Sequence, residues 1–521
     1  MTALAVEPAA PTEQPIDQSL RLEARIRARA ATVAVLGLGY VGLPLAVAFA
    51  RAGYGVYGVD VDAAKVARLR AGTSPIRDVP DHALREVLHT PSRPHTPQAP
   101  QAREAARTIG ANGRVPASAP PAAPSGADGP APRTGGGAGT LAGGAAAGGR
   151  LVPTTDYGVL AGADAVVISV PTPMTPMKQP DLRHIEAAAA GIAARLRPGM
   201  LVVVQSTTYP GTTEREVRPI LERGSGLRAG ADFHLAFVPE RLNPGDPRWT
   251  VETLPTVAGG ATPRCGALAA ALFGALGASV TVVSSPAAAE LAKCYENTFR
   301  FVNIALANEL ATLCERMGLD AWEVIAACAT KPFGFLAHYP SAGVGGHCIL
   351  VDPYYLACAA RAYDVSLGFI QLAADVNEGM PYHVAGLVAR ALGRAGVPLR
   401  GARVLVLGVA FKRDIDDARN SPAERLVEAL LEDGAEVAYH DPHVPEFPAH
   451  SDLARRCPFR LESVPLDDSR LQATDCAVLV QAHAGIDYAR VAALARTVVD
   501  ACGALPPAAA RAPHVTRLGV G

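Results

Sequence analysis

The segment at residues 31–46 reads ATVAVLGLGYVGLPLA and decides the fold class. Its first six residues are small or apolar and predict a buried β-strand, three glycines follow, and an apolar run then predicts a helix. Residues 31–50 carry no charge and are long enough to imitate a membrane-spanning helix. Because the glycines and Pro44 interrupt this stretch, we expect a strand, a turn and a helix of a buried α/β unit instead.

The glycine spacing, GxGxxG, also predicts a site for a phosphate group. In such a turn the first glycine makes the bend, the second lets the backbone approach a pyrophosphate, and the third lets the helix pack on the strand. Backbone N–H groups at the helix N-terminus favour the anion. A purely structural glycine turn is the alternative. The residues expected at this site are Gly37, Gly39, Tyr40, Val41 and Gly42.

An acidic residue after the second predicted strand favours a dinucleotide at this turn. Asp60 follows the strand YGVYGV at the distance where a carboxylate binds the adenosine ribose hydroxyls. The same carboxylate would repel a 2′-phosphate, so the sequence predicts NAD rather than NADP. Asp62 is the rival for this role, and we expect it on the surface.

Apolar runs alternate with helical patterns along most of the chain, which predicts parallel sheets covered on both faces. We expect a tail and lead-in helix at 1–30, a Rossmann-like domain at 31–285, a central helical domain at 286–394 and a second Rossmann-like domain at 395–521. The fold class is therefore α/β, with two doubly wound domains that look like weak echoes of each other. A stretch rich in Pro, Ala and Gly at about 91–150 predicts a disordered insertion.

Composition limits the partners. The chain has 48 Lys and Arg against 49 Asp and Glu, so no basic excess favours nucleic acid, and no basic amphipathic stretch favours a membrane surface. Nine cysteines are scattered without CxxC pairs or zinc-ligand spacing, so we expect free thiols and no metal site. Together with the lack of a signal-peptide pattern, this predicts a cytoplasmic protein.

One cysteine lies in a loop of unusual composition. Residues 345–353 read GGHCILVDP, so two glycines precede Cys348 and Asp352 follows four residues later. The glycines give backbone room for a ligand to reach the thiol. On cysteine statistics alone, a buried structural thiol in a glycine turn is the better interpretation, and only the surrounding segments overturn it.

Seven segments occur in an order that closely resembles the UDP-glucose/UDP-N-acetylhexosamine 6-dehydrogenase family: GLGYVGLPLA, SVPTP, QSTTYPGTT, FVPERLNPGD, AELAKCYENTF, GVGGHCILVDPYYL and GVAFKRDIDDARNSP. The resemblance covers roughly residues 31 to 503, apart from the insertion. It implies a four-electron oxidation of a sugar C6 alcohol by two successive NAD⁺. The thiol that matches Cys348 forms a thioester, which suits the strong nucleophilicity of a thiolate.

The resemblance also implies roles for residues outside the cysteine loop. Lys293 and Asn297 match donors to a developing oxyanion, and their i, i+4 spacing puts both on one helix face. Asp352 matches a carboxylate that assists with water, while Thr207 and Glu240 match residues that hold water and assist proton transfer. The alternatives are a solvated helix face for Lys293 and an ordinary surface pair for Glu240 with Arg241.

The remaining assignments concern the ligands and the assembly. Thr172 of SVPTP is expected at the cofactor, and the third domain is expected to bind the UDP-sugar. The substrate residues implied are Lys293, Tyr339, Gly343, Gly345, Gly346, Lys412 and Arg419. The helical centre resembles the dimer interface of the family, so a homodimer or a higher even oligomer is expected.

The sequence departs from the family pattern at two places near the thiol. Leu350 stands where a proline is usual, and PSAG at residues 340–343 replaces the common PGPG. Both departures change the stiffness of the loop.

The substrate branch is also indicated by motifs. PERLNPGD and GGHCILVD look like the UDP-N-acetylhexosamine branch, and Arg241 is expected to add donors beside the sugar. UDP-glucose is the alternative substrate. Two other functions stay open: a single-step hydroxyacid dehydrogenase, which would share a Lys and an Asn but not use Cys348, and a degenerate enzyme that serves as a binding module.

Overall fold

The computed structural model describes residues 15–76, 78–88, 149–175, 178–243, 248–346, 348–449 and 457–521. The insertion predicted at about 91–150 lies outside these residues except for its last two positions. His347 of the cysteine loop and residues 244–247, which include the last three positions of the PERLNPGD segment, also lie outside them.

The first domain is built around one large sheet. Its strands are β1 (Thr32–Leu36), β2 (Gly55–Val59), β3 (Arg150–Thr154), β4 (Ala165–Ile168), β5 (Leu201–Val204), β6 (His234–Phe237), β7 (Thr256–Gly260) and β8 (Val280–Val283). Its helices are α1 (Pro15–Arg27), α2 (Gly42–Arg51), α3 (Ala63–Arg70), α4 (Asp81–Leu88), α5 (Arg183–Ala193), α6 (Arg218–Ser225) and α7 (Pro263–Gly274), with short turns η1 (Tyr157–Gly162) and η2 (Thr213–Val217).

The strand order in this sheet is β3-β2-β1-β4-β5-β6-β7-β8. All neighbours run parallel except β6 and β7, which pair antiparallel, so the sheet is mixed only at that step. The order reverses between β1 and β4, where the glycine turn follows β1. In open α/β sheets this switch point is where ligands bind. The charge-free stretch is thus split into β1 and α2, and no helix in the described part of the chain is long and apolar enough to cross a bilayer.

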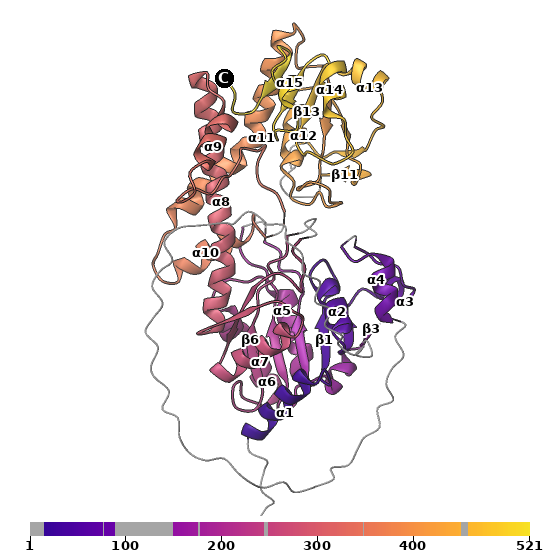
Figure 1. Ribbon diagram of the computed structural model, residues 1–521, viewed down its shortest axis with the longest axis vertical. Coiled ribbons are helices and arrows are strands. Elements are labelled where there is room, and N and C mark those ends of the chain that lie inside the picture. The colour runs from indigo at the N-terminus through magenta and orange to yellow at the C-terminus, as the bar shows by residue number, and fades with distance from the viewer. Residues whose placement is uncertain are drawn as a thin grey trace, which may run out of the picture.

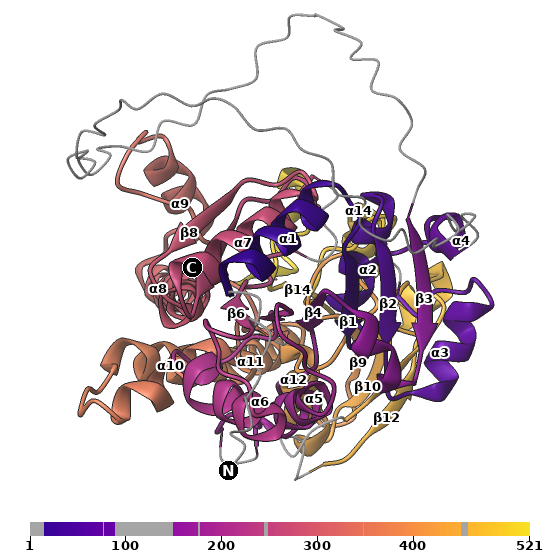
Figure 2. The same cartoon turned by 90° about the horizontal axis from the view of Figure 1, so that it is seen from below.

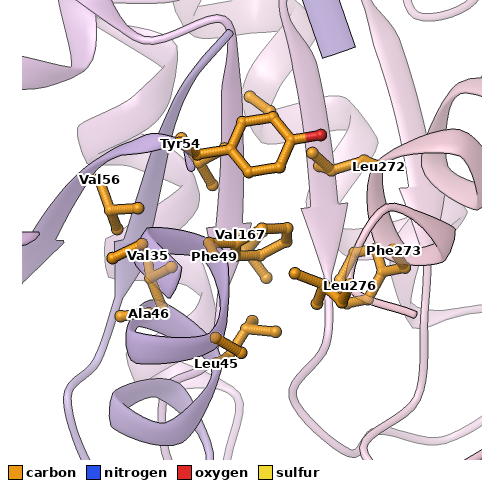
Figure 3. Close-up of a cluster of buried hydrophobic side chains, with 14 of the residues drawn as sticks. Val35, Leu45, Ala46, Phe49, Tyr54, Val56, Val167, Leu272, Phe273 and Leu276 are labelled. Carbon is orange, nitrogen blue, oxygen red and sulfur yellow. The ribbon is translucent and has the colours of Figure 1, made fainter. Parts of the chain in front are cut away.

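Apolar side chains cover both faces of the large sheet. On one face Phe49 of α2 packs edge-on against Tyr54 and Phe273, with ring centroids 5.7 and 5.8 Å apart (Figure 3). The lead-in helix α1 joins this core, because Leu22 and Ile26 are buried in it and the Tyr54 hydroxyl donates to the Ile26 carbonyl at 2.8 Å. Helices α5 and α6 cover the other face. Each large apolar side chain buried in this way contributes about 1.5–3 kcal/mol.

The central domain is helical: α8 (Pro286–Met317), α9 (Ala321–Ala329), α10 (Asp352–Arg361) and α11 (Gly368–Arg394). Helix α8 has clear end signals. The Ser285 hydroxyl accepts from the Ala288 N–H at 3.2 Å, Pro286 occupies the first turn, and Gly318 ends the helix at φ 71°. Its 32 residues extend about 48 Å. In Figure 1 this helix runs from the first domain up to the third.

The third domain holds a second, fully parallel sheet with the order β10-β9-β13-β14-β15. Its strands are β9 (Arg403–Leu407), β10 (Glu436–His440), β13 (Cys476–Leu479), β14 (Val498–Asp500) and β15 (Val515–Arg517). A small antiparallel pair, β11 (Glu446–Pro448) and β12 (Arg460–Glu462), lies beside it. The helices are α12 (Pro422–Glu432), α13 (Asp468–Ala473), α14 (Tyr488–Leu494) and α15 (Pro507–Ala510).

The third domain repeats the local design of the first. Asp441 follows β10 and accepts the backbone N–H groups of Val409 and Ala410, at 2.8 and 3.0 Å, from the turn after β9. Asp60 follows β2 and accepts the Leu38 N–H at 2.8 Å from the turn after β1. The predicted fold class, two Rossmann-like domains joined by a helical one, is confirmed (Figures 1 and 2).

We propose domain boundaries where the elements change type. Strand β8 ends at Val283 and α8 begins at Pro286, while α11 ends at Arg394 and β9 begins at Arg403. We assign helix α1 to the first domain, because Leu22 and Ile26 are buried in its core.

Candidate active site

Four segments that are distant in sequence meet around Cys348. Helix α8 contributes Lys293 and Asn297, and the residues after β6 contribute Glu240. The Lys293 ammonium lies 3.9 Å from a Glu240 carboxylate oxygen, and the two side chains are only 6% and 9% exposed. The solvated-face and surface-pair alternatives for these residues are therefore wrong.

The charge on Lys293 is held in place by its neighbours. Burial by itself lowers the pKa of Lys293, but the negative charge that Cys348, Glu240 and Asp352 can carry outweighs burial and raises it above its usual value. Burial raises the pKa of Glu240, against the opposing effects of Lys293 and the Leu242 N–H. A buried ammonium in this setting is a fixed positive charge, as the expected role at a developing oxyanion requires.

Asp352 is the first residue of α10 and is fully buried. Its backbone N–H donates to the Cys348 carbonyl at 2.8 Å, which closes the turn between the two residues. The Asn297 amide donates to Asp352 Oδ2, whereas Oδ1 has no hydrogen-bond partner among the described residues. Burial raises the pKa of Asp352 to about 7, although Lys293 and Asn297 oppose the shift. The carboxyl is thus poised to exchange a proton near neutral pH.

The Cys348 thiol is held in its protonated form by its surroundings. Burial raises its pKa to about 12, while the Lys293 charge and a hydrogen bond with the Thr207 side chain act in the opposite direction. Thr207 lies in the loop after β5, at the carboxyl end of the sheet. The structure therefore brings together all six residues expected to act in catalysis, and Thr207 is linked to the others through the thiol.

Two residues that sequence reasoning missed tether the loops of this site. The Tyr355 hydroxyl, from α10, donates to the Thr172 and Pro173 carbonyls at 2.6 and 3.1 Å. The Cys294 thiol, from α8, donates to the Thr208 carbonyl at 3.3 Å. Cys294 follows Lys293 directly on the buried face of α8. That position in the helix pattern is the sequence signal that could have identified it as a residue of the site.

The three motif glycines divide the expected roles between them. A Cβ on Gly37 would lie 2.4 Å from the Ser169 carbonyl oxygen, and one on Gly42 would lie 1.8 Å from the Gly37 oxygen. Nothing lies within 4 Å of a Cβ built on Gly39. The turn is therefore tight at its first and third glycines and open at its second, as a bound pyrophosphate requires. Helix α2 also starts without a capping side chain at Val41.

The carboxylate expected at the ribose is already engaged. Asp60 is 7% exposed, and besides the Leu38 N–H it contacts the Asp62 N–H at 3.0 Å and the Lys65 ammonium at 2.8 Å. Asp62 is exposed, as expected, and its carboxylate caps α3 by accepting the Ala64 and Lys65 N–H groups. That cap explains the second acidic residue without a cofactor role.

Two expected substrate residues lie between the first and third domains. The Lys412 ammonium donates to Asn243 Oδ1 at 2.6 Å. The Arg419 guanidinium binds the Asp417 carboxylate through two bonds, 2.9 and 2.8 Å long, and lies 5.5 Å from the centre of the Tyr40 ring in the glycine turn. The third domain thus meets the first at the cofactor motif.

The other expected substrate residues have structural partners. Tyr339 stacks on Trp322 of α9, with centroids 5.4 Å apart. Gly343 and Gly346 have φ values of 128° and 103° that favour glycine. A Cβ on Gly345 would lie 2.8 Å from Phe411 Cβ. These glycines were expected to leave room for a ligand. At Gly345 the expectation is wrong, because residues of the third domain fill the space beside it.

The contacts of Arg241 differ from those expected from the sequence. It was expected to add donors beside the sugar, but its guanidinium pairs with Glu296 at 2.5 Å and donates to the Pro255 carbonyl at 2.8 Å. Its donors are directed to the protein, so this residue does not support a substrate choice.

Three models of the UDP-glucose/GDP-mannose dehydrogenase family match the chain in order. The NAD-binding domain matches residues 31–95 and 137–276, the central domain matches 287–379, and the UDP-binding domain matches 405–507. The first match confirms the predicted NAD cofactor, and Gly39 leaves the space that it needs.

Similar proteins carry related names. The chain is 34% identical over 413 residues to a UDP-N-acetyl-D-mannosamine dehydrogenase of Pyrococcus horikoshii, covering 79% of this chain and 84% of the relative. It is 34% identical over 413 residues to a UDP-N-acetyl-D-glucosamine 6-dehydrogenase of Pseudomonas aeruginosa, covering 79% and 83%.

Solved structures agree with this. The UDP-D-ManNAc dehydrogenase of Pyrococcus horikoshii superposes with a TM-score of 0.75 at 29% identity, covering 94% of this chain and 99% of the other. A UDP-glucose dehydrogenase of Pyrobaculum islandicum gives 0.71 at 28%, covering 94% and 98%. The chain therefore belongs to the UDP-glucose/GDP-mannose dehydrogenase family and is an NAD-dependent dehydrogenase of nucleotide sugars.

Proposed function

We propose that the chain oxidises the C6 alcohol of a UDP-N-acetylhexosamine to the carboxylate through a thioester on Cys348. The observation that carries this proposal is the grouping of a thiol, the charged Lys293 and the poised Asp352 carboxyl in one buried place. A one-step alcohol dehydrogenase would have no use for the thiol at that position.

The reaction proceeds through four bonding changes at C6. The alcohol first loses a hydride from carbon and a proton from oxygen, which leaves an aldehyde. The Cys348 thiolate adds to the aldehyde carbon, a second hydride leaves, and the product is a thioester. Water then breaks the carbon–sulfur bond and releases the acid and the thiol. NAD supplies the hydride acceptor, one molecule for each of the two oxidation steps.

The residues of the site divide the remaining work. Lys293 offers its charge to the oxygen on C6 whenever that oxygen becomes negative. Asp352, with a pKa of about 7, is suited to take the proton of the thiol and later a proton of the attacking water. Its unpartnered Oδ1 is free for that contact among the described residues. Thr207 hydrogen-bonds the sulfur and favours the thiolate, and the Glu240 carboxylate pairs with the Lys293 ammonium.

Counting reduced cofactor tests the mechanism. We expect two NADH for each sugar acid, measured by absorbance together with mass spectrometry of the product. One NADH for each sugar and an aldehyde or ketone product would favour the single-step hydroxyacid dehydrogenase instead.

The names of the relatives support an N-acetylated substrate. Relatives similar over most of the chain are named UDP-N-acetyl-D-mannosamine and UDP-N-acetyl-D-glucosamine dehydrogenases. UDP-glucose is the second candidate, supported by the similar UDP-glucose dehydrogenase structure. In a competition assay with NAD⁺ we expect UDP-N-acetylglucosamine or its manno or galacto epimer to have the highest kcat/KM. A faster reaction of UDP-glucose than of all three would overturn this choice and leave the thioester mechanism intact.

We also propose a homodimer, or a higher even oligomer, built on α8. Large apolar side chains at helical spacing are exposed along this helix, among them Tyr295 at 64%, Leu306 at 61% and Leu313 at 53%. Such a stripe on a soluble enzyme is typical of an interface. All nine cysteines are free thiols, which supports a cytoplasmic location in a reducing compartment. Fractionation of cells that express the tagged chain tests the location.

A further inference from the structure

One buried carboxylate near the site has no part in the chemistry described above. Glu290 lies on α8, three residues before Lys293 and seven before Asn297, and is fully buried. These spacings put the three side chains on neighbouring positions of one helix face. A buried carboxylate is costly unless its oxygens are satisfied, so its partners indicate what it does.

The partners of Glu290 all lie in the segment after β5. Glu290 Oε2 accepts the Gly211 N–H at 2.5 Å, and Oε1 accepts the Thr213 N–H at 2.9 Å and the Thr213 hydroxyl at 2.6 Å. The Thr208 hydroxyl donates a weaker bond to Oε1 at 3.4 Å. Every donor is a neutral group, so the carboxylate acts as a cap for this turn, supplied by another helix.

The capped segment carries Thr207. On its N-terminal side the Ser206 hydroxyl donates to the Val170 carbonyl at 2.7 Å. On its C-terminal side Glu290 holds Thr208, Gly211 and Thr213. Gly211 has a φ of 97°, which suits glycine, and its N–H is the group that Glu290 holds at this bend. Thr207, whose side chain hydrogen-bonds the Cys348 thiol, is thus fixed from both sides.

We propose that Glu290 is a positioning residue that holds Thr207 against the Cys348 sulfur and thereby sets the reactivity of the thiol. The inference rests on the proposed role of Cys348 and adds the element that orients its hydrogen-bond partner. One face of α8 then has two roles. It presents Lys293 and Asn297 to the reacting atoms, and through Glu290 it holds the loop after β5 in place.

Replacement by glutamine tests this role. In Glu290→Gln one oxygen becomes an NH₂ group, which puts a donor against the Gly211 N–H or against the Thr213 donors. The readout is the rate at which iodoacetamide alkylates Cys348 in the free enzyme at pH 8, followed by mass spectrometry of the peptide that contains this cysteine. We expect alkylation about threefold to tenfold slower, comparable to Thr207→Val, because Thr207→Val removes a hydrogen bond to the thiolate and Glu290→Gln displaces its donor.

Two comparisons separate positioning from general damage. Glu186→Gln replaces an exposed glutamate on α5 and should leave the alkylation rate unchanged. In the Thr207→Val background, Glu290→Gln should have no further effect, because interacting residues are non-additive. Alkylation at the wild-type rate in Glu290→Gln, or an equal slowing in both backgrounds, would overturn the proposal.

A milder variant covers the case in which Glu290→Gln does not fold. Thr213→Val removes only the 2.6 Å bond from the hydroxyl and should slow alkylation to a smaller extent, again only when Thr207 is present. An unchanged rate in Thr213→Val would then count against the proposal. Failure of the proposed function is recognised separately, by acid production in Cys348→Ala, because the alkylation assay requires no turnover.

Discussion

At the scale of single residues, burial raises the pKa of both groups that exchange a proton in the proposed reaction. The thiol of Cys348 has a pKa of about 12 and the carboxyl of Asp352 one of about 7. In both cases the dominant cause is removal from water, and Lys293 opposes it. The free enzyme therefore keeps its nucleophile protonated until a proton acceptor and the substrate are in place.

The role of Cys348 predicts a large loss when the thiol is removed. Cys348→Ala should lower acid production by about a thousandfold or more, because no other nucleophile replaces it. NAD affinity, measured by calorimetry, should stay near the wild-type value. Cys328→Ala, at an exposed cysteine, is the matched control and should be fully active. A Cys348→Ala enzyme that keeps a tenth of its acid production would contradict the assignment.

The raised pKa of Asp352 predicts that the stability of the folded protein falls as the pH rises into the range where the carboxylate can act as a base. Its pKa is about 7 in the folded protein, above the usual 3.8, so the folded state binds this proton more tightly than the unfolded state. Stability from this group is complete below about pH 4, falls as the pH rises to 7, and is constant above that. Between pH 5 and pH 8 the loss is roughly 3 kcal/mol.

The variant Asp352→Asn removes this titration. It should raise Tm relative to wild type at pH 8 and less so at pH 5, while thioester hydrolysis slows. Thermal scans at both pH values, paired with single-turnover product analysis, make the comparison. An equal change of Tm at the two pH values would show that the carboxyl does not titrate in this range.

At the scale of elements, different glycines of the turn between β1 and α2 are expected to serve folding and NAD binding. A Cβ has open space at Gly39 but would lie 1.8 Å from the Gly37 oxygen at Gly42. We expect Gly39→Ala to leave stability within about 0.5 kcal/mol of wild type and to weaken NAD binding about tenfold or more, because the methyl group occupies the path of the pyrophosphate. Gly42→Ala should instead lower the free energy of unfolding by about 2 kcal/mol.

Denaturant titration and NAD binding, measured on both variants, check this division. If Gly39→Ala binds NAD as tightly as wild type, then the open position does not face the cofactor.

At the scale of the whole molecule, α8 links the domains and carries the proposed interface. Leu306→Glu, placed in the middle of the exposed stripe, should shift the enzyme to monomers because an unpaired charge would be buried between copies. Light scattering after size-exclusion chromatography measures the mass. Arg223→Glu, on α6 and exposed, makes a larger charge change in the same direction away from the stripe and should leave the mass unchanged. A monomeric wild-type enzyme would contradict the proposed dimer outright.

A single carboxylate also joins the three domains. Glu378 of α11 accepts the Lys178 ammonium at 2.7 Å and the Tyr354 hydroxyl at 2.6 Å, and pairs with Arg425 of α12 at 3.3 Å. Burial acts to raise its pKa, but the hydrogen bonds from Lys178 and Tyr354 prevail and lower it. The network connects the loop after β4, the helix that follows the cysteine and the third domain.

The sequence by itself determined the local elements and the reactive residue types. Strand and helix patterns follow from short-range sterics and periodicity, so the α/β plan, the glycine turn and Asp60 were predicted from neighbouring residues. The shared face of Lys293 and Asn297 follows in the same way from helix geometry. The chemical roles proposed for them came from the resemblance of ordered motifs, not from any single pattern.

Only the tertiary structure decided what surrounds those residues. The pKa of Asp352, the pairing of Arg241 with Glu296, the packing of Gly345 on Phe411 and the cap that Glu290 supplies all depend on segments that are distant in the chain. Desolvation and long-range hydrogen bonds have no signature in local sequence, because they are created when separate elements pack together. For that reason the sequence predicted the groups proposed to react, and the fold determined how each is charged, oriented and held.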